Sequence, residues 1–273
     1  MGFLPLLVPL DGGSTEELFE HLGWPPGVES FAGRPLLPGV LPDWVTNTVA
    51  QAIIGAILVI IMWLVFARKQ TIVPSRRQFA GEFLYDIVRN GIGRDILGPD
   101  FRPYLPYLLG LISFIIVNNF FGEFFFFMFP TFSHIAYPYA LAIMSWLLYI
   151  IVGIKRFGVG HYFKKMLIPE GVPVGLYPLI IPLEFISNFI VRPVTLALRL
   201  FANMFAGHLV IMVFVIGGTL LIELGGPLIA AGSVSLIMSF AIFALELFVG
   251  ALQAYIFTVL TAQYVSSSIA EGH

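Results

Sequence analysis

Five long apolar stretches limit what this chain can fold into more than any other feature of its sequence. They run from about 46 to 67, 105 to 129, 139 to 154, 175 to 216 and 227 to 266. A helix needs about 20 consecutive apolar residues to cross the hydrocarbon core of a bilayer. Since 58% of the 273 residues are hydrophobic and only 11% are charged, the chain has too little polar surface for a water-soluble protein. The sequence therefore predicts an all-α membrane protein with about five transmembrane helices.

Two regions outside these spans have a different character. Residues 1–45 are rich in Pro and Gly and carry mainly acidic charges, which predicts an extramembrane N-terminal arm. The remainder, 46–273, is predicted to form a single membrane domain. Within it, residues 76–96 place apolar side chains such as Phe79 and Phe83 on one side and Glu82 and Asp86 on the other. This pattern predicts an amphipathic helix that lies in the membrane interface.

The positions of the basic residues predict how the chain is oriented. Arg68 and Lys69 follow the first span and Lys155 and Arg156 follow the third, whereas the loop between the second and third spans contains no Lys or Arg. Basic residues are enriched in cytoplasmic loops of membrane proteins. We therefore expect a multi-pass protein with the N-terminus outside and the C-terminus inside.

The last two spans are too long to stand upright in a membrane. Each covers roughly 40 residues, or about 60 Å of helix, against a hydrocarbon core of about 30 Å. Such helices must be steeply inclined or kinked, and Pro178, Pro182 and Pro193 are candidate break points. The short segment 217–227 between the spans predicts that they form an antiparallel hairpin.

The fourth span contains an arginine, and this residue needs a specific explanation. Arg199 stays protonated even when buried, so within a membrane it requires an anionic partner or water. On an ideal helix, Arg199 and Asn203 share one stripe while His208 points to the opposite side. We therefore expect Arg199 to face a carboxylate on another subunit. A lone intramembrane amide such as Asn203 can equally serve to hold helices together.

A second group of polar residues lies on the fifth span. Glu246 and Gln253 share a stripe of that helix, and antiparallel packing would bring Glu246 to the depth of His208. Histidine titrates near neutral pH, and burial raises the pKa of a carboxyl group toward the same range. Such a pair can relay protons, whereas the arginine cannot release its proton and would block them. Like Asn203, Gln253 has helix packing as its alternative role.

Other classes of function fit the sequence less well. A self-contained proton or cation transporter remains the alternative, but it would be expected to show paired repeats and a second mid-span carboxylate besides Glu246. A structural scaffold would not justify Arg199. The absence of cysteine excludes thiolate chemistry, and no constellation for an intramembrane hydrolase is present. No Gly-rich phosphate loop or basic tract is found, so no nucleotide, nucleic acid, cofactor or metal is expected on this chain.

Two strings resemble the signature helices of the subunit a family of F-type (rotary) ATP synthases. They are PVTLALRLFANMFAGHLV (193–210) and ELFVGALQAYIFTVLTAQYV (246–265), accompanied by FIIVNNFFGE (114–123) and PLEFISNFIVRPV (182–194). The resemblance covers most of the chain beyond the N-terminal arm. It implies a stator subunit that is not an enzyme by itself and that couples proton flow to rotation and ATP synthesis. The implied partners are the ring of c subunits, the subunit b stalk, other ATP synthase subunits and the lipid bilayer.

The resemblance also implies roles for individual residues. Arg199 matches the essential arginine that faces the c-ring carboxylates, and Asn203 lies beside that contact. The implied lining of the outer half-channel consists of His208, Glu246, Gln253, Asn118 and Asn119. Glu184 and Ser187 match positions associated with the inner half-channel. Some members exchange the types of residue found here at His208 and Glu246, and the stretch from 184 to 199 is one residue longer than in many relatives.

Overall fold

The computed structural model describes residues 23–31, 35–36, 42, 45–68, 71–123, 130–168 and 173–270. Most of the predicted N-terminal arm, the end of the predicted second span (124–129) and the last three residues lie outside the described part. Contacts between Cα atoms divide the chain into two compact units. Unit 1 comprises Met1–Ala32 and Ala206–Glu246, and unit 2 comprises Gly33–Phe205 and Leu247–His273.

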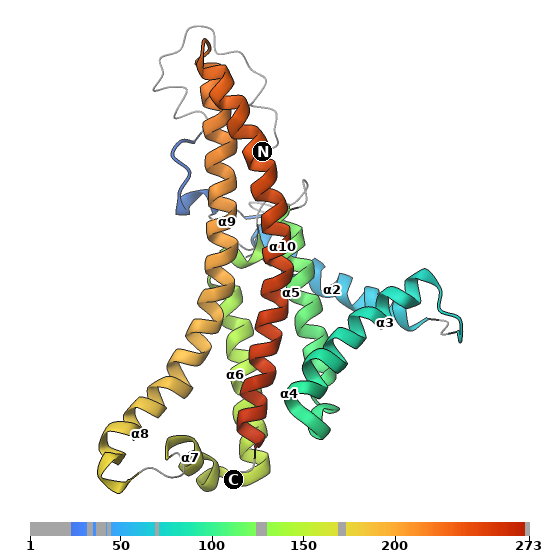
Figure 1. Cartoon of the computed structure of the whole chain (residues 1–273), viewed down its shortest axis with the longest axis vertical. Helices are drawn as coiled ribbons and strands as arrows, with labels where there is room; N and C mark the ends of the chain where they lie inside the picture. The colour runs from blue at the N-terminus through green and yellow to red at the C-terminus, as the bar shows by residue number, and fades with distance from the viewer. Residues whose placement is uncertain are drawn as a thin grey trace. The chain divides into compact units, whose positions relative to one another are not determined.

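Five helices in the described part are long and apolar enough to cross a membrane. They are α2 (Asn47–Ala67), α5 (Leu105–Glu123), α6 (Ala136–Phe157), the continuous stretch Tyr177–Glu223, and α10 (Leu228–Ile269). In Figure 1 the colour of these helices runs from blue to red in the order of the chain. The chain is therefore an all-α, multi-pass membrane protein, as the apolar stretches predict.

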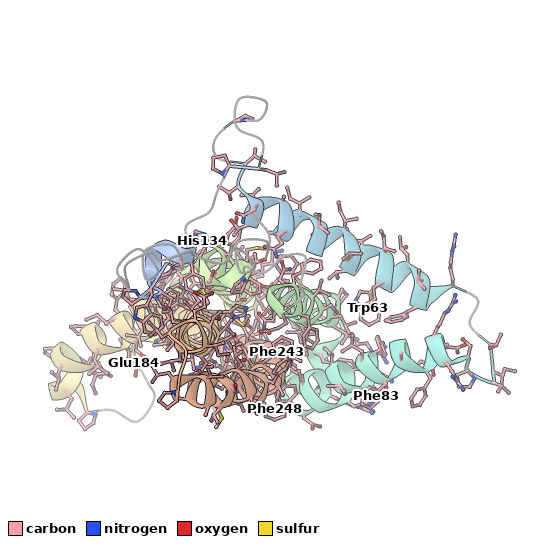
Figure 2. All side chains as sticks on the ribbon, turned by 90° about the horizontal axis from the view of Figure 1, so that it is seen from above. Trp63, Phe83, His134, Glu184, Phe243 and Phe248 are labelled. Atoms are coloured by element: carbon pink, nitrogen blue, oxygen red, sulfur yellow. The ribbon has the colours of Figure 1, made fainter. Side chains whose placement is uncertain are left out.

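Helices α2 and α3 are both capped at their N-termini by a hydroxyl side chain. The Thr46 hydroxyl accepts a hydrogen bond from the Val49 N–H at the start of α2, and Ser75 caps α3 (Arg76–Val88) in the same way. Two further segments continue the amphipathic stretch, the π-helix η3 (Arg89–Arg94) and the short α4 (Asp95–Leu97). Figure 2 labels Trp63 on α2, whose indole N–H donates to Ser113 of α5 at 3.0 Å.

The core of unit 2 lies where α5 and α6 pack against the parts of α9 (Arg192–Glu223) and α10 that belong to this unit. Fully buried members include Leu108, Ile115, Leu200 and Phe257. Polar links cross the same core: the Tyr107 hydroxyl lies 2.9 Å from the Ser145 hydroxyl. The short helix α7 (Val159–Leu167) follows α6. This core holds the first turns of α9 in place and thereby orients the side chains around Arg199.

The fourth membrane span is not a regular α-helix throughout. It consists of α8 (Tyr177–Ile186), the π-helix η7 (Ser187–Val191) and α9 (Arg192–Glu223). Pro182 lies inside α8, and Pro193 follows η7 as the second residue of α9. Because proline lacks an N–H, the α-helical bond to the carbonyl four residues earlier cannot form at Pro193. A π-turn at this point absorbs that irregularity, and it also accommodates one additional residue in the chain.

In unit 1, the end of α9 and the start of α10 form a tight antiparallel pair. The α9 helix runs to Glu223, beyond the position expected from the sequence, so the connector is shorter than the predicted segment 217–227. Gly225 and Gly226 make the turn with φ values of 74° and 62°. Within the predicted connector, Gly218 serves packing instead, since a Cβ on Gly232 of α10 would lie 2.5 Å from the Gly218 carbonyl oxygen. Small residues at this contact let the two backbones approach closely.

Candidate functional site

Arg199 lies on the exposed side of α9 within unit 2. Its neighbours Leu196, Ala197 and Leu200 are at most 2% exposed and belong to the core, whereas Arg199 itself is exposed. Among the described residues it has no ion-pair partner. The helix therefore presents a permanent cation outward from unit 2, in a stretch that is long and apolar enough to cross a membrane.

One helical turn after this arginine, a hydrogen bond joins α9 to α10. The Asn203 side-chain amide donates to the Gln253 side-chain oxygen at 2.8 Å. Gln253 is 2% exposed, and its own Nε2 has no hydrogen-bond partner among the described residues. The pairing satisfies one polar group from each helix, yet it leaves a buried donor that needs a further acceptor.

Asn118 and Asn119 are adjacent on α5 but contact different helices of unit 2. The Asn119 amide donates to the Gly250 carbonyl of α10 at 2.7 Å. Asn118 donates to the Phe114 carbonyl at 2.9 Å and lies against Gly55 of α2, where an added Cβ would come within 2.6 Å of its Nδ2. Both asparagines are at most 2% exposed.

In unit 1, His208 and Glu246 form a close buried pair. His208 Nδ1 lies 2.5 Å from Glu246 Oε1, and the two residues are 8% and 5% exposed. The predicted antiparallel packing of the last two spans thus does bring these residues to the same depth. Gly207 makes room for the carboxylate, because a Cβ at this position would lie 2.4 Å from Glu246 Oε1. The second carboxylate oxygen has no hydrogen-bond partner among the described residues.

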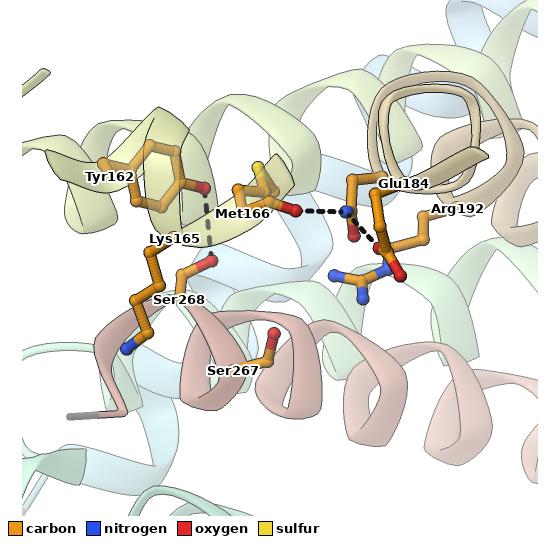
Figure 3. Close-up of a pocket in the computed structure, with 8 residues that line it drawn as sticks. Tyr162, Lys165, Met166, Glu184, Arg192, Ser267 and Ser268 are labelled. Atoms are coloured by element: carbon orange, nitrogen blue, oxygen red, sulfur yellow. Dashed lines mark hydrogen bonds between the residues drawn. The ribbon is translucent and has the colours of Figure 1, made fainter. Parts of the chain in front are cut away.

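Glu184 lines a polar pocket of unit 2, shown in Figure 3, with a volume of about 180 Å³. Its other lining residues are Tyr162, Lys165, Met166, Asn188, Arg192, Ser267 and Ser268. The Asn188 amide donates to Glu184 Oε2 at 3.0 Å and to the Met166 carbonyl at 3.3 Å. Ser187, the other residue predicted here, is not among the lining residues. The structure thus groups Glu184 with Asn188 in one pocket.

Two further side chains set the electrostatics of this pocket. The Arg192 guanidinium lies over the Tyr264 ring, 5.3 Å from its centroid, at a distance typical of cation–π contacts. Burial raises the pKa of the Tyr162 hydroxyl above its usual value, while the hydrogen bond with Ser268 and the charge of Arg192 lower it in part. Tyr162 therefore stays neutral at physiological pH and serves as a hydroxyl donor or acceptor.

Sequence reasoning did not single out the residues that complete this pocket. Asn188, Tyr162 and the two serines come from three different helices, and no spacing in the sequence connects them. For Arg192 the sequence does offer a signal, because this residue shares a stripe of the fourth span with Arg199.

The fold and these side chains define a multi-pass membrane protein with ionisable groups inside its spans. Comparison with known proteins shows which family within this class the chain belongs to. Residues 48–266 match the family model described as ATP synthase A chain. The chain is 45% identical over 230 residues to ATP synthase subunit a of Nocardioides sp.. This alignment covers 84% of this chain and 83% of that protein.

Two other relatives cover even more of the chain. ATP synthase subunit a of Pseudarthrobacter chlorophenolicus is 40% identical over 258 residues, and that of Arthrobacter sp. is 42% identical over 252 residues. Each alignment spans 91% of this chain and 94% of the relative. The chain therefore belongs to the ATP synthase A chain family. It is a non-catalytic membrane subunit that works with other subunits of the ATP synthase in ATP synthesis and proton transport.

Proposed function

We propose that this chain is the stator subunit that conducts protons to and from the c-ring of an F-type ATP synthase. In this proposal it provides two half-channels that are offset from each other and do not meet. One loads protons onto the c-ring carboxylates and the other unloads them, so that net proton flow requires rotation. The alternative is a self-contained proton or cation transporter. It does not account for an arginine that lies within a membrane span, faces outward and has no ion-pair partner in the described part of the chain.

The exposed Arg199 is the observation that carries the proposal. A guanidinium cannot release its proton at any physiological pH, so it is an obstacle to protons and an attractive partner for a carboxylate. Placed opposite the c-ring, Arg199 would displace the proton from each arriving carboxylate. It would also prevent direct leakage between the half-channels. Asn203 would hold Gln253 beside this contact.

We assign His208, Glu246, Gln253, Asn118 and Asn119 to the outer half-channel, as the resemblance to the family implies. The short contact between the imidazole and the carboxylate supports a relay, because a proton can pass between a ring nitrogen and a carboxylate oxygen at hydrogen-bonding distance. The orphaned amide atoms of the other three residues support contact with water.

We assign the inner half-channel to the pocket that contains Glu184. Asn188 holds one carboxylate oxygen, and the surrounding hydroxyls and cations favour water in the pocket. Ser187 contributes through the backbone in this assignment, since its carbonyl accepts the Arg192 N–H at the end of the π-helix.

The remaining elements of the proposal concern energy and assembly. A proton that crosses the membrane contributes about 2.3 kcal/mol per 100 mV, so several must be coupled to each ATP. The chain would reside in the bacterial plasma membrane with its N-terminus outside and its C-terminus inside. The c-ring and the subunit b stalk would be its direct partners.

Replacement of Arg199 tests the proposal. We expect Arg199→Ala to abolish ATP synthesis driven by a proton gradient in vesicles that contain the assembled complex. Arg199→Lys should also lose most of the activity, because an ammonium lacks the planar fork of the guanidinium and its pKa falls more easily on burial. Synthesis at the wild-type rate in Arg199→Ala would refute the proposal.

A matched control separates this effect from a general loss of positive charge. Arg76 is exposed at the start of α3, outside the membrane spans. Arg76→Ala should therefore leave both assembly and coupled synthesis unchanged. Quantification of the subunit in the purified complex would show that each variant is incorporated.

A further inference from the structure

The π-helix η7 deprives one backbone carbonyl of its usual hydrogen-bond donor. In a regular α-helix each carbonyl accepts the N–H four residues later, which for Asn188 is that of Arg192. The Arg192 N–H donates to the Ser187 carbonyl instead, as a π-helix requires. The donor five residues after Asn188 would be Pro193, which has no N–H. The Asn188 carbonyl therefore has a backbone donor in neither the α-helical nor the π-helical position.

A side chain from another helix satisfies this carbonyl. The Tyr149 hydroxyl of α6 donates to the Asn188 carbonyl oxygen at 2.8 Å. Both residues are at most 2% exposed. A buried carbonyl that lacks a donor is costly, because it has given up its hydrogen bonds to water without replacement. The hydroxyl of Tyr149 thus stabilises the irregular turn at the point where its backbone cannot satisfy itself.

The ring of Tyr149 is held in place independently of this hydrogen bond. It lies edge-on to the ring of Tyr264 from α10, with centroids 5.8 Å apart and an interplanar angle of 62°. Such edge-to-face pairs are favourable arrangements of aromatic rings. The Arg192 guanidinium lies over the same Tyr264 ring. These contacts aim the hydroxyl, so little further order is needed for it to meet the carbonyl.

Asn188 connects the hydroxyl of Tyr149 with the pocket that contains Glu184. The side-chain amide of Asn188 donates to Glu184 Oε2 at 3.0 Å and to the Met166 carbonyl at 3.3 Å, drawn as dashed lines in Figure 3. Its backbone carbonyl is the group that accepts from Tyr149. A shift of the backbone at this residue would therefore also move the amide that holds the carboxylate.

We propose that Tyr149 is a positioning residue for the Glu184 carboxylate. Its hydroxyl keeps η7 in the π-helical register, and this register keeps the Asn188 amide on Glu184. Tyr149 does not touch the carboxylate in this arrangement, since it acts through the Asn188 backbone. The inference deepens the proposed inner half-channel and rests on it for the role of Glu184 in proton transfer.

Removal of a single oxygen atom tests the proposal. Tyr149→Phe keeps the ring and its packing but leaves the Asn188 carbonyl without this donor. The matched control is Tyr107→Phe, which removes another hydroxyl from the same core. In that variant Ser145 keeps its contact with the Thr261 hydroxyl at 3.4 Å, so no buried group loses its last partner. Both variants would be incorporated into the complete complex, and the amount of subunit would be quantified.

Cross-linking measures the geometry of η7, because the chain contains no native cysteine. Phe189 follows Asn188 in η7, and its ring stacks on that of Phe163 from α7 with centroids 5.8 Å apart. A short bifunctional thiol reagent should join the cysteines of Phe163→Cys and Phe189→Cys in the assembled complex. We expect Tyr149→Phe to lower the yield of this cross-link severalfold and Tyr107→Phe to leave it unchanged. An unchanged yield in Tyr149→Phe would overturn the proposal.

ATP synthesis at varied pH on each side of the membrane measures the functional consequence. A displaced Glu184 carboxylate should slow the release of protons to the inner side. We expect Tyr149→Phe to slow synthesis severalfold and to steepen its dependence on the inner pH, with the dependence on the outer pH unchanged. A purely structural defect would reduce the amount of complex and leave both pH profiles as they are, and that result would also overturn the proposal.

The two measurements separate this inference from the proposed function. The cross-link yield does not depend on proton flow, so it reports on Tyr149 and η7 alone. A lowered yield with wild-type synthesis at every pH would confirm the positioning of Asn188 and refute the assignment of Glu184 to the inner half-channel. An unchanged yield would refute the role of Tyr149 and leave the proposed half-channels untouched.

Discussion

The contact between His208 and Glu246 can be predicted from the sequence, whereas their role cannot. Their sequence separation from the turn between the last two helices predicts that they meet, and they do so within 2.5 Å. Their chemistry, a titratable base against a carboxylate, is what a proton relay requires. The order in which they carry the proton is not fixed by the contact alone.

A double-mutant cycle on this pair tests the relay at the residue scale. We expect His208→Ala and Glu246→Ala each to slow proton uptake, and the double variant to be no slower than the worse single variant. Both residues serve one step, so their effects should not add. Independent sites would instead add within about 0.3–0.5 kcal/mol in ΔΔG. Initial rates of gradient-driven uptake in vesicles would decide, and additive losses in log rate would refute the relay.

At the scale of single residues, the sequence indicates which charged and amide side chains are candidates for the site, but it does not predict the pocket that surrounds Glu184. Arg199 and Asn203 could be placed because their types are costly in a membrane wherever they occur. Asn188 and Tyr162 could not, because each contacts residues of another helix that no spacing in the sequence connects with it. Their polarity is ordinary, and only burial distinguishes them.

At the scale of elements, the π-helix η7 sets the rotation between Glu184 and Arg199. An ordinary α-helix turns by about 100° per residue, so one extra residue absorbed in a π-turn changes which side chains upstream face the pocket. The pocket is lined by Glu184, which precedes the π-helix, and by Arg192, which follows it, so both depend on this rotation. The π-helix also offers a physical reason for the additional residue between 184 and 199.

Deletion of Ile190 tests the importance of this rotation. The deletion should convert η7 to α-helix and turn Glu184 by roughly 100° relative to Arg199. We expect a loss of coupled ATP synthesis with the subunit still present in the complex. Ile190→Ala keeps the residue count and serves as the control, with synthesis near the wild-type rate. Normal synthesis in the deletion variant would show that the rotation of α8 relative to α9 is unimportant.

The prediction of elements from the sequence failed mainly at their ends. The segment 217–227 reads as a connector because it contains four glycines and a proline, yet its first half is helical. Glycine weakens an isolated helix, but against a neighbouring helix it permits a close contact that compensates. The deciding factor is the partner helix, which local sequence does not reveal.

At the scale of the whole molecule, the five apolar helices among the described residues establish a multi-pass membrane protein, and the distribution of Lys and Arg predicts its orientation. The number and approximate place of the spans follow from hydropathy because lipid tolerates little else. The division into two compact units does not follow from the sequence, since α9 and α10 each contribute to both.

The predicted orientation can be measured with two single cysteines. One would replace Ser14 in the N-terminal arm and the other Lys164 in α7. We expect an impermeant thiol reagent to label the first only from outside and the second only from inside. Parallel labelling after detergent solubilisation would show that both thiols are reactive. Labelling of both from the same side would mean that the number of membrane crossings between them is even, which contradicts the proposed topology.

The space left by Gly207 has a consequence for where the carboxylate of Glu246 rests. A Cβ at position 207 would lie 2.4 Å from Glu246 Oε1, so a larger residue there must push the end of this flexible side chain aside. The glycine therefore acts as a spacer that lets the carboxylate lie against the imidazole of His208.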